Sequence, residues 1–394
     1  MKILVVTEVF YPENGLVNDF ALELKARGHH VDVLTSHPSY PLGKIFPGYE
    51  NVEYFCDQWE GIDIHRFRFV EGYRESKIRK IRNYHTFVRQ GKKVGLKIGG
   101  GYDHIIVYQT GPLTVALPAV AIKKRHKVPV TIWTFDIWPD AVYTYGFPRI
   151  WPANAFLDRL IMRVYRSADH ILVSSAQFRE SVKAYVPDRE IHYAPNWLIP
   201  EKEEPSSLRL DPTVFNFTFT GNISMAQNLE NVLSGWKLAD LRDSVLNIVG
   251  DGSSFEALRA KIEKEGIRGV ILHGRFPSDQ IQDILGQSRM LVLPLVSGGI
   301  EKTEPYKLQS YLKAGKPILG ILNGSAQEII NDNGLGICAL PDDIREIADA
   351  FAKAPEFAKE NSAQIADNAG KLLKMRFNRE RIIDSIMSVI ENRS

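Results

Sequence analysis

Short apolar runs alternate with amphipathic helical patterns along this chain, and that alternation constrains the fold more than any other feature. Runs that are mostly apolar, without strict alternation, predict strands buried on both faces, as in a parallel sheet covered by helices. In the first half they are KILVVTEVF at 2–10, HVDVLTS at 30–36, HIIVYQT at 104–110, VPVTIWTFD at 128–136 and HILVSS at 170–175. Helical patterns separate these runs, so we predict a doubly wound, Rossmann-like α/β domain.

The alternation breaks once and then restarts, which predicts two domains. The segment PNWLIPEKEEPSSLRLDPTVF at 195–215 has four prolines and a charge cluster, a composition typical of a linker. Strand patterns then return as FNFTFTG at 215–221, VLNIVGDG at 245–252, GVILHGRF at 269–276, MLVLPL at 290–295 and KPILGI at 316–321. A chain of 394 residues is also long for one core. We expect a first domain over 1–197, a linker over 198–213 and a second Rossmann-like domain over 214–375.

Composition and charge exclude several classes of protein. The formal net charge of +2 predicts no whole-molecule attraction to an acidic partner. Cys56 and Cys338 are too few and too far apart for a disulfide framework or a metal cluster, and they suit a reducing cytosol. The N-terminal residues predict a strand rather than a signal peptide, and no apolar run approaches transmembrane length. Dinucleotide and P-loop fingerprints are also absent from the sequence.

Candidate ligand-binding residues of the first domain follow its predicted strands. Ligands of doubly wound sheets bind beyond the carboxyl ends of the strands, and a cleft shared by two such domains is the default site. Asn14 and Gly15 lie in YPENGLVND, after the first strand and before a helix whose N-terminus could hold an anion. An ordinary strand-to-helix turn explains the same residues.

A second candidate in this domain is TFDIWPDAVYTYGF at 134–147. Asp136 falls at the end of a predicted strand, where active residues gather in this architecture. Aromatic side chains beside it offer stacking faces for a sugar ring or an amphipathic carrier. The aromatic and acidic residues in this segment are Trp138, Asp140, Tyr143 and Tyr145. An aromatic domain interface, with Asp136 as a helix cap, is the alternative.

The second domain also ends its predicted strands in glycine turns. Gly221 and Asn222 could present backbone and amide donors to a phosphate, although Ser224 capping a helix would explain the turn equally well. Arg275, after a further strand, could hold a phosphate with two hydrogen bonds or lie in solvent. Their shared place at strand ends favours a ligand site over isolated turns.

The segment EPYKLQSYLKAGKPILG at 304–320 predicts a helix with clear ends. Pro305 suits the first turn, and Gly315 followed by Pro317 ends the helix. Amphipathic packing does not explain Lys307 and Ser310, which lie about one turn apart on a flank near the N-terminus.

A basic stretch at 77–97 is the strongest local charge feature, with eight Lys or Arg and no acid. Interleaved apolar residues make it an amphipathic helix of the kind that binds membrane surfaces. The residues that we expect to face an anionic membrane are Lys77, Arg79, Lys80, Arg82, Arg89, Lys92 and Lys93. A solvated face and nucleic-acid binding are the alternatives, and of these partners we expect the membrane and no nucleic acid.

Taken together, these motifs resemble the bacterial glycosyltransferases of the GT-B fold, in particular the large retaining family four and its fucosamine-transferase-like members in capsule and O-antigen assembly. The resemblance covers nearly the whole chain. Its segments are YPENG, DIWPD, PNW, GNISMAQNLENVL, GDG, HGRFP, VLPL and PYKLQSYLKAGKPIL. It implies two Rossmann-like domains facing a central cleft, and a C-terminal helix over 376–394 that crosses back to the first domain.

The resemblance also implies a role for each matching residue. Gly15, Gly221, Asn222 and Arg275 would lie near the donor nucleotide and its phosphates, and Asp136 on the acceptor side with Asn14, Trp138 and Asp140. The helix start would meet the donor sugar and phosphates, and the residues expected there are Thr303, Glu304, Tyr306, Lys307 and Ser310.

One departure from the family lies in this same helix. The family has two glutamates seven residues apart, and Thr303 and Ser310 occupy those positions here. Lys307 would then stabilise the leaving diphosphate, because a cation at a helix N-terminus can hold developing negative charge without a metal. No Asp-x-Asp sequence suggests a metal-bound diphosphate, and we expect neither metal nor cofactor.

The resemblance implies a cytoplasmic enzyme, peripheral on the inner face of the cell membrane. It would move a sugar from a nucleotide diphosphate, UDP in our expectation, to a polyprenyl-diphosphate-linked saccharide, with retention. Two alternatives stay open: a nucleotide-sugar epimerase or hydrolase of the same fold, and a non-catalytic scaffold that docks on lipid.

Overall fold

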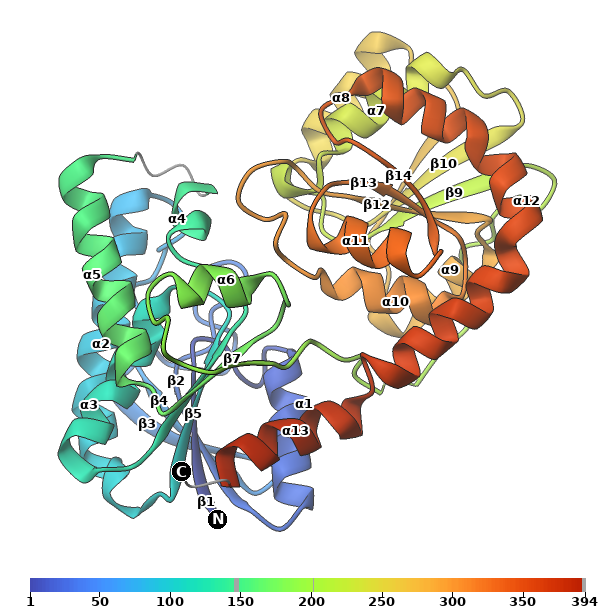
Figure 1. Cartoon of the computed structure of the whole chain (residues 1–394). Coiled ribbons are helices and arrows are strands. Elements are labelled where there is room, and N and C mark those ends of the chain that lie inside the picture. Colours follow the sequence, from blue (N-terminus) through green and yellow to red (C-terminus); the bar gives the residue numbers. More distant parts are fainter. Residues whose placement is uncertain (145–148, 201, 392–394) are drawn as a thin grey trace. The chain divides into compact units, whose positions relative to one another are not determined.

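The computed structural model describes residues 1–144, 149–200 and 202–391, which divide into two units (Figure 1). Unit 1 contains Met1–Pro195 and the C-terminal segment from Glu380, and unit 2 contains Asn196–Arg379. Each unit has its own sheet with helices on both faces, which confirms the predicted pair of Rossmann-like α/β folds.

Unit 1 is built on an eight-stranded sheet in the order β3-β4-β2-β1-β5-β6-β7-β8. Its strands are β1 (Lys2–Thr7), β2 (His30–Ser36), β3 (Tyr54–Trp59), β4 (Ile62–Phe67), β5 (His104–Gln109), β6 (Val130–Thr134), β7 (His170–Val173) and β8 (Ile191–Tyr193). All neighbours pair in parallel except the edge strand β3, which is antiparallel to β4. The strand order reverses between β1 and β5, so the switch point of unit 1 lies there.

Helices cover both faces of this sheet. They are α1 (Leu16–Ala26), α2 (Lys77–Ile98), α3 (Ala116–His126), α4 (Asp140–Thr144), α5 (Trp151–Ser167), α6 (Phe178–Lys183) and α13 (Arg379–Glu391). Figure 1 shows α2, α3 and α5 along one face, with α1 and α13 on the other. The C-terminal α13 is tied to α1 by an ion pair of 2.6 Å between Arg27 Nη1 and Asp384 Oδ1.

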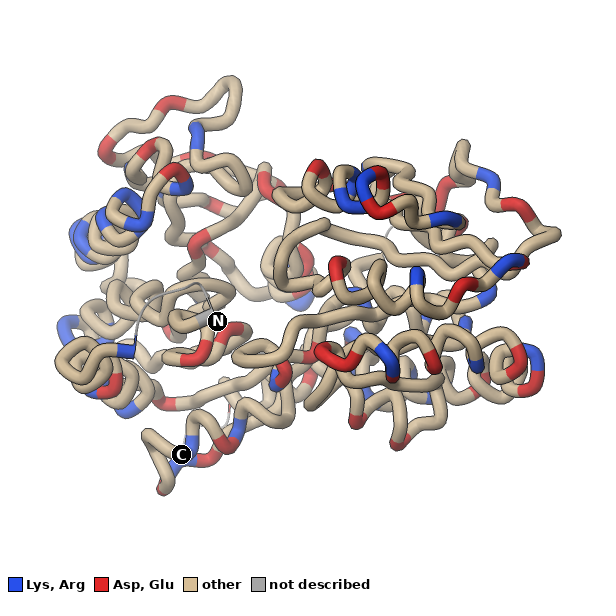
Figure 2. Tube along the Cα trace, turned by 90° about the horizontal axis from the view of Figure 1, so that it is seen from above, with Lys and Arg blue, Asp and Glu red and all other residues tan. Residues whose placement is uncertain are grey.

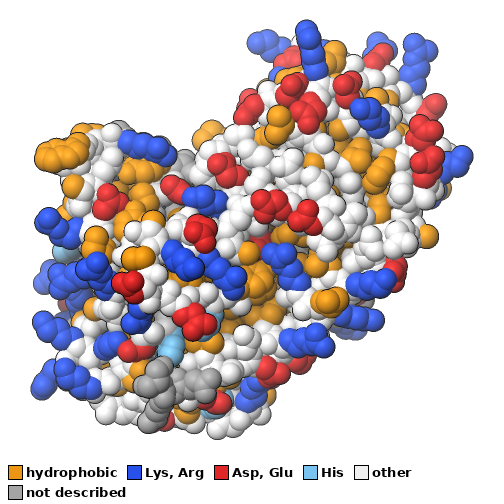
Figure 3. Space-filling view, in the orientation of Figure 1, with side chains coloured by type: hydrophobic (Ala, Val, Ile, Leu, Met, Phe, Trp, Pro, Cys, Tyr) orange, Lys and Arg blue, Asp and Glu red, His pale blue; other side chains and the backbone are white. Residues whose placement is uncertain are grey.

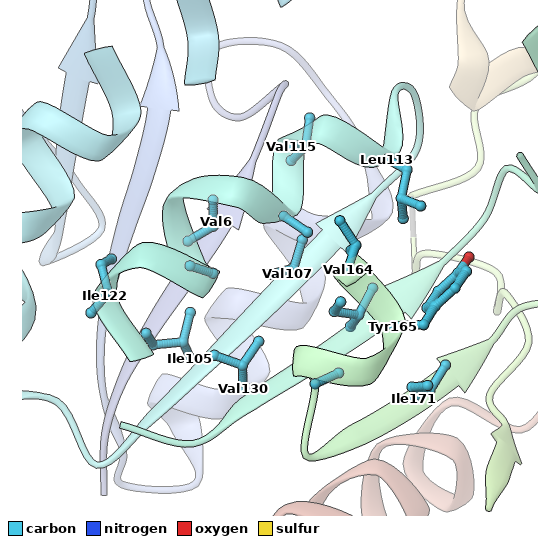
Figure 4. Close-up of a cluster of buried hydrophobic side chains, with 14 of the residues drawn as sticks. Val6, Ile105, Val107, Leu113, Val115, Ile122, Val130, Val164, Tyr165 and Ile171 are labelled. Atoms are coloured by element: carbon cyan, nitrogen blue, oxygen red, sulfur yellow. The ribbon is translucent and has the colours of Figure 1, made fainter. Parts of the chain in front are cut away.

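The core of unit 1 forms where the apolar strands meet α3 and α5. Val6, Val107 and Val130 project from three strands toward Ile122 and Val164 on the helices (Figure 4). All five side chains are fully buried. This packing supports the strand ends on which the candidate residues lie.

Unit 2 has a six-stranded parallel sheet in the order β11-β10-β9-β12-β13-β14. Its strands are β9 (Phe215–Thr220), β10 (Ser244–Val249), β11 (Val270–Gly274), β12 (Met290–Pro294), β13 (Ile318–Ile321) and β14 (Gly336–Ala339). Its helices are α7 (Leu229–Ala239), α8 (Phe255–Glu265), α9 (Ile281–Gln287), α10 (Tyr306–Ala314), α11 (Ser325–Asp332) and α12 (Ile344–Met375). Successive residues of β12 point into two cores, because Val292 packs on the α7 side of the sheet and Leu293 on the α10 side.

The segment 198–213, which we expected to be a linker, packs within unit 2. The backbone N–H of Ser206 donates to Asp283 at 2.9 Å, and that of Leu210 donates to Gln287 at 3.0 Å. Both acceptors lie on α9, so the proline-rich composition marks a segment that lines the unit rather than a free connection.

Among the helices in the described part of the chain, none is both long enough and apolar enough to cross a membrane.

Candidate functional site

The central feature of unit 2 is the point where its strand order reverses, between β9 and β12. These two strands pair only at Phe217–Met290 and Thr218–Leu291, and they separate toward their carboxyl ends. The hydroxyl of Tyr311 fills that gap, accepting from Thr220 N and donating to Val292 O, both at 3.1 Å. Burial raises the pKa of Tyr311 to about 12, so the hydroxyl keeps its proton at neutral pH. Tyr311 therefore fixes the opening at the switch point.

Two glycine turns border this opening at very close range. Gly221 has a φ of +136° and its N–H donates to Val249 O at 2.9 Å. Gly250 has a φ of +147°, and a Cβ there would lie 1.8 Å from Gly221 O. Asn222, which follows Gly221, is exposed. No side chain fits where the turns cross, so backbone groups line this part of the site.

Lys307 reaches this opening from α10, one helical turn before Tyr311. Its Nζ would lie 3.1 Å from a Cβ on Gly221, is 4.0 Å from the centre of the Phe219 ring, and donates to Gln227 Oε1. The side chain keeps partial contact with solvent, but removal from water lowers the pKa of its ammonium to about 7. The structure thus brings Lys307 beside the glycine turn at Gly221 and gives it Gln227 as a partner, which the sequence did not indicate, while its contact with a donor stays a prediction.

The predicted neighbours of Lys307 differ in their surroundings. Thr303 is half-buried, and its N–H donates to Ile300 O at 3.0 Å. Tyr306 is 41% exposed, and its hydroxyl accepts from Ile199 N at 3.3 Å. Ser310 is half-buried. These three stay predictions as donor-binding residues.

Glu304 has a structural partner. Its carboxylate is buried and pairs at 2.8 Å with Arg376, at the end of α12. Breaking such a buried ion pair would leave an uncompensated charge. Glu304 therefore contributes to the packing of the start of α10 on α12, and its contact with a donor stays a prediction.

Arg275 directly follows Gly274, whose carbonyl accepts from the N–H of Gly250 at 2.7 Å. It is exposed and directly follows β11, which is the edge strand two places from β9. Its predicted contact with a nucleotide stays a prediction.

The loop between β1 and α1 in unit 1 owes its shape to Glu13. The buried Glu13 carboxylate accepts from the N–H groups of Ser39 at 2.8 Å and Tyr40 at 2.5 Å, while Asn18 Nδ2 donates to Glu13 O at 3.0 Å. The next residue, Asn14, is exposed. Glu13 lies inside the YPENG motif, but nothing in the sequence distinguishes a buried acid from an exposed one.

Gly15 does not need to be glycine for the backbone to take this shape. Its φ is −171°, which is extended, and a Cβ there would come no closer than 3.9 Å to Val17. The backbone shape therefore does not require glycine here, and any contact of Gly15 with a ligand stays a prediction.

Asp136 lies at the carboxyl end of β6, as expected. Its backbone carbonyl accepts from Gln109 Nε2 at 3.0 Å, and the same amide donates to Gly111 O at 2.5 Å. Burial raises the pKa of the Asp136 carboxyl to about 7, and the positive charge of Lys80 opposes that rise. At neutral pH this acid exchanges its proton readily, which suits a residue that meets substrate hydroxyls.

Sequence reasoning missed Glu8, which directly follows β1. Burial raises the pKa of Glu8 to about 7, opposed by Lys80 and supported by the charge of Asp136. Lys80, which was predicted to face a membrane, is half-buried on α2, and its charge lowers the pKa of both Glu8 and Asp136. Its contact with a membrane stays a prediction.

The aromatic residues near Asp136 have mixed surroundings. Trp138 is partly buried and packs against the core of unit 1. Tyr143 donates to Asn154 Oδ1 at 2.7 Å, and Asp140 begins α4. Tyr145 lies outside the described residues.

The remaining basic residues of α2 are only partly free to meet a surface. Arg79 pairs with Glu75, and Lys93 pairs with Glu53 at 2.9 Å. Lys92 is half-buried, whereas Lys77, Arg82 and Arg89 are exposed. Lys and Arg positions gather along the edge of unit 1 that carries α2, α3 and α5 in the backbone trace of Figure 2, and Figure 3 shows basic side chains on this side of the unit.

The described residues include no group of three or more His, Cys, Asp or Glu side chains that could hold a metal ion.

Two protein-family models match the chain. The model described as "Glycosyl transferase 4-like domain" matches residues 16–197, and "Glycosyl transferases group 1" matches residues 200–389. Their common boundary falls near residue 198, close to the division between the two units at Pro195.

Individual proteins match the chain at low sequence identity. A probable glycosyltransferase, WbjE of Pseudomonas aeruginosa, is 27% identical over 221 residues, which cover 53% of this chain and 55% of WbjE. The chain thus spans about half the length of this curated relative.

Two solved structures cover nearly the whole chain. Sucrose-phosphate synthase from Thermosynechococcus elongatus superposes with a TM-score of 0.74 at 14% identity, covering 99% of this chain and 98% of that one. HepE of Anabaena in complex with UDP superposes with a TM-score of 0.70 at 14% identity, covering 99% of both chains. At these identities the likeness establishes the shared fold.

Proposed function

Since the chain belongs to the glycosyltransferases of the GT-B fold, we propose that it transfers a sugar from a nucleotide diphosphate to a lipid-linked saccharide. The donor nucleotide in this proposal is UDP, and the acceptor is carried on a polyprenyl diphosphate. The transferred group is a hexosyl or N-acetylhexosaminyl unit, transferred with retention during assembly of capsule, O-antigen or exopolysaccharide. The reaction takes place at the cytoplasmic face of the cell membrane.

The observation that carries this proposal is the ammonium of Lys307 at the switch point of unit 2. This ammonium is largely removed from water and has no carboxylate partner among the described residues. Its hydrogen bond goes to the neutral amide of Gln227. A ligand diphosphate would supply the missing negative charge, and backbone groups at Gly221 and Gly250 can approach it closely. During transfer, a diphosphate leaving group gains charge, which a preorganised cation stabilises.

The structural relative HepE supports UDP as the nucleotide, because it was solved with UDP bound. The fucosamine-transferase-like members remain the subgroup that we favour, on the Thr303 and Ser310 pattern of the sequence.

The donor half of the proposal can be tested directly by calorimetry with UDP, comparing Lys307→Met with Lys264→Ala. Lys264 is an exposed cation of unit 2 on α8 and serves as the matched control. Loss of one charge-assisted contact should weaken UDP binding about 10- to 100-fold in Lys307→Met and leave the control unchanged. Equal affinity in all three proteins would remove Lys307 from the donor site.

Transfer itself requires a chemical readout. We would incubate the protein with UDP-sugars and short-chain polyprenyl-diphosphate saccharides and follow products by mass spectrometry. A product heavier by one sugar residue supports the proposal. Turnover of donor alone would instead favour the epimerase or hydrolase reaction, for which the titrating acids Glu8 and Asp136 supply suitable groups.

The exposed side of α2 supports the membrane part of the proposal. Ile78 and Ile81 are 72% and 52% exposed beside the cations Lys77 and Arg82. Apolar side chains among cations can enter the interface of an anionic bilayer while the charges attract its headgroups. Figure 3 shows this mixture of apolar and basic side chains on the surface of unit 1.

A further inference from the structure

Three neighbouring strands of unit 1 bring Glu8 and Asp136 to the same edge of the sheet. The strands are adjacent in the order β1-β5-β6. Thr7 pairs with Tyr108, and Gln109 pairs with Thr134, so the three chains leave the sheet at nearly the same level. Glu8 therefore follows a strand that is separated from β6 only by β5, and Asp136 follows β6.

The missing side chain of Gly111 leaves the space that the Glu8 carboxylate occupies. Gly111 follows β5, and a Cβ on it would lie 2.6 Å from Glu8 Oε2. Because β5 separates β1 from β6, a Glu8 carboxylate placed against Gly111 extends over the end of the intervening strand. This geometry directs the Glu8 carboxylate toward the side of the sheet that carries Asp136, whose charge contributes to the raised pKa of Glu8.

Gln109 holds the same corner in place. Its Nε2 donates to Gly111 O at 2.5 Å and to Asp136 O at 3.0 Å, which joins the ends of β5 and β6. Gln109 is fully buried, and its Oε1 has no hydrogen-bond partner within the described residues. A buried acceptor that stays unsatisfied is costly unless a ligand or water donates to it.

Cations and further ionisable groups surround this pair. Lys80 of α2 and Arg74 in the preceding loop oppose the rise in the pKa of Glu8, while Glu13 adds to it. Burial raises the pKa of Tyr73, and the charge of Glu8 contributes to that rise. Lys80 itself is half-buried and has a lowered pKa because of burial and the charge of Arg74. The corner thus holds hydrogen-bond acceptors and donors side by side.

We propose that Glu8 and Asp136 act as one carboxyl pair that binds hydroxyl groups of the acceptor saccharide, with Lys80 donating to the same groups. The proposal rests on the transferase function above. A sugar hydroxyl both donates and accepts hydrogen bonds, so it matches a site of carboxylates and an ammonium. A phosphate oxygen only accepts and finds no use for two carboxylates. Unit 1 therefore selects the saccharide part of the acceptor, and Glu8 is a specificity-determining residue.

This assignment makes acceptor binding depend on pH. Each carboxyl loses its proton near neutral pH, and the carboxylate is the stronger hydrogen-bond acceptor. Acceptor affinity should therefore rise as the pH increases through about 7. Glu8→Gln should weaken this rise without altering the pH dependence of UDP binding in unit 2.

The first test needs no substrate. Dicyclohexylcarbodiimide reacts with protonated carboxyls that are shielded from water, and peptide mass spectrometry locates the adducts. On the full chain, we expect labelling of Glu8 and Asp136 to fall off around pH 7, with exposed Glu180 as the reference acid. In Asp136→Asn, the Glu8 transition should move to lower pH because a negative neighbour is gone. A Glu8 transition that stays in place would overturn the pairing.

The second test uses transfer to whichever lipid-linked saccharide is turned over. Glu8→Gln should raise the acceptor KM about 10- to 100-fold, the size of a lost bond to a charged group, with a smaller change in kcat. Gly111→Ala should do the same by displacing the Glu8 carboxylate, since the clash is with the end of a flexible side chain. Glu180→Gln is the matched control on the surface of unit 1.

The outcomes separate this proposal from the function on which it rests. If Glu8→Gln and Gly111→Ala keep the wild-type acceptor KM and its pH dependence, the carboxyl pair does not bind the acceptor although the enzyme is a transferase. If neither UDP binding nor transfer is found, the proposed function fails, and the labelling result still decides whether the two acids titrate as a pair.

Discussion

The ammonium of Lys307 lies 4.0 Å from the centre of the Phe219 ring, and its hydrogen bond goes to Gln227. A ring face and an amide oxygen stabilise a cation less than a carboxylate does, so burial lowers the pKa of Lys307 to about 7. At neutral pH the unliganded protein thus holds this side chain near half protonation. Binding of an anion would shift that balance.

Donor binding should therefore be accompanied by proton uptake. A diphosphate beside Lys307 favours the charged form and returns its pKa toward 10.5, the ordinary value. We expect UDP binding at pH 8 to take up a substantial fraction of one proton, measured by calorimetry in buffers of different ionisation enthalpy. Lys307→Met should bind UDP weakly and without this uptake.

The free energy of unfolding of the unliganded protein should depend on pH because of the lowered pKa of Lys307. Between about pH 7 and 10.5 the unfolded chain holds a proton on Lys307 that the folded protein has largely released. The unfolded state then binds more protons, so this group makes stability rise with pH across that window. The free energy of unfolding of the wild type, relative to Lys307→Met, should increase by about 1–2 kcal/mol from pH 7 to pH 10, after discounting for partial contact with solvent. Urea denaturation at each pH measures this free energy. If it changes with pH by the same amount in both proteins, the prediction is wrong.

The strands could be predicted from sequence where they are buried on both faces. KILVVT has an apolar centre and MLVLP is apolar throughout because helices cover both sides, and the structure places β1 and β12 there. The edge strand β3 has mostly exposed residues, and β14 has only four residues, so neither carries a continuous apolar signal. Strands of this kind are recognisable only from their neighbours in the sheet.

From the sequence, only those residues of the candidate site could be predicted that stand out at the end of a single strand or the start of a single helix. Asp136 and Lys307 each stand out by chemical type beside a predicted strand or helix start. Glu8 lies equally close to a strand end, but its meaning depends on Gly111 and on the order β1-β5-β6, which the chain alone does not reveal. Lys80 shows the same limit, because composition identified a basic helix but not which of its cations turns inward.

Tyr311→Phe should destabilise unit 2 while leaving its fold intact. The substitution removes the hydroxyl that joins Thr220 N to Val292 O, and both backbone groups would lose a partner in a buried place. Leaving buried polar groups unsatisfied costs about 1–3 kcal/mol, which thermal unfolding of the full chain would detect. Tyr306→Phe provides the comparison, since its exposed hydroxyl accepts one bond of 3.3 Å. Similar losses in both variants would mean that Tyr311 does not bridge the strand ends.

Membrane binding should depend on one exposed stripe of α2 and not on the helix as a whole. Ile78, Arg82, His85 and Arg89 are all exposed and recur at intervals of three or four residues, which places them along one side of the helix. Reversing Arg82 and Arg89 to Glu removes two attractive charges and adds two repulsive ones. At about 1 kcal/mol per charge, binding to vesicles containing anionic phosphatidylglycerol should fall by about 30-fold or more.

Two controls distinguish this stripe from charge in general. Lys80→Met should bind vesicles within about 5-fold of the wild type while impairing transfer, because its charge faces Glu8 and Asp136. Reversal of Lys237 and Lys264 on unit 2 changes net charge equally and should leave vesicle binding in place. If sedimentation with the vesicles is unchanged by reversing Arg82 and Arg89, this side of α2 is a solvated face. Loss of binding in the unit 2 variant as well would mean that net charge, rather than the stripe, draws the protein to the lipid.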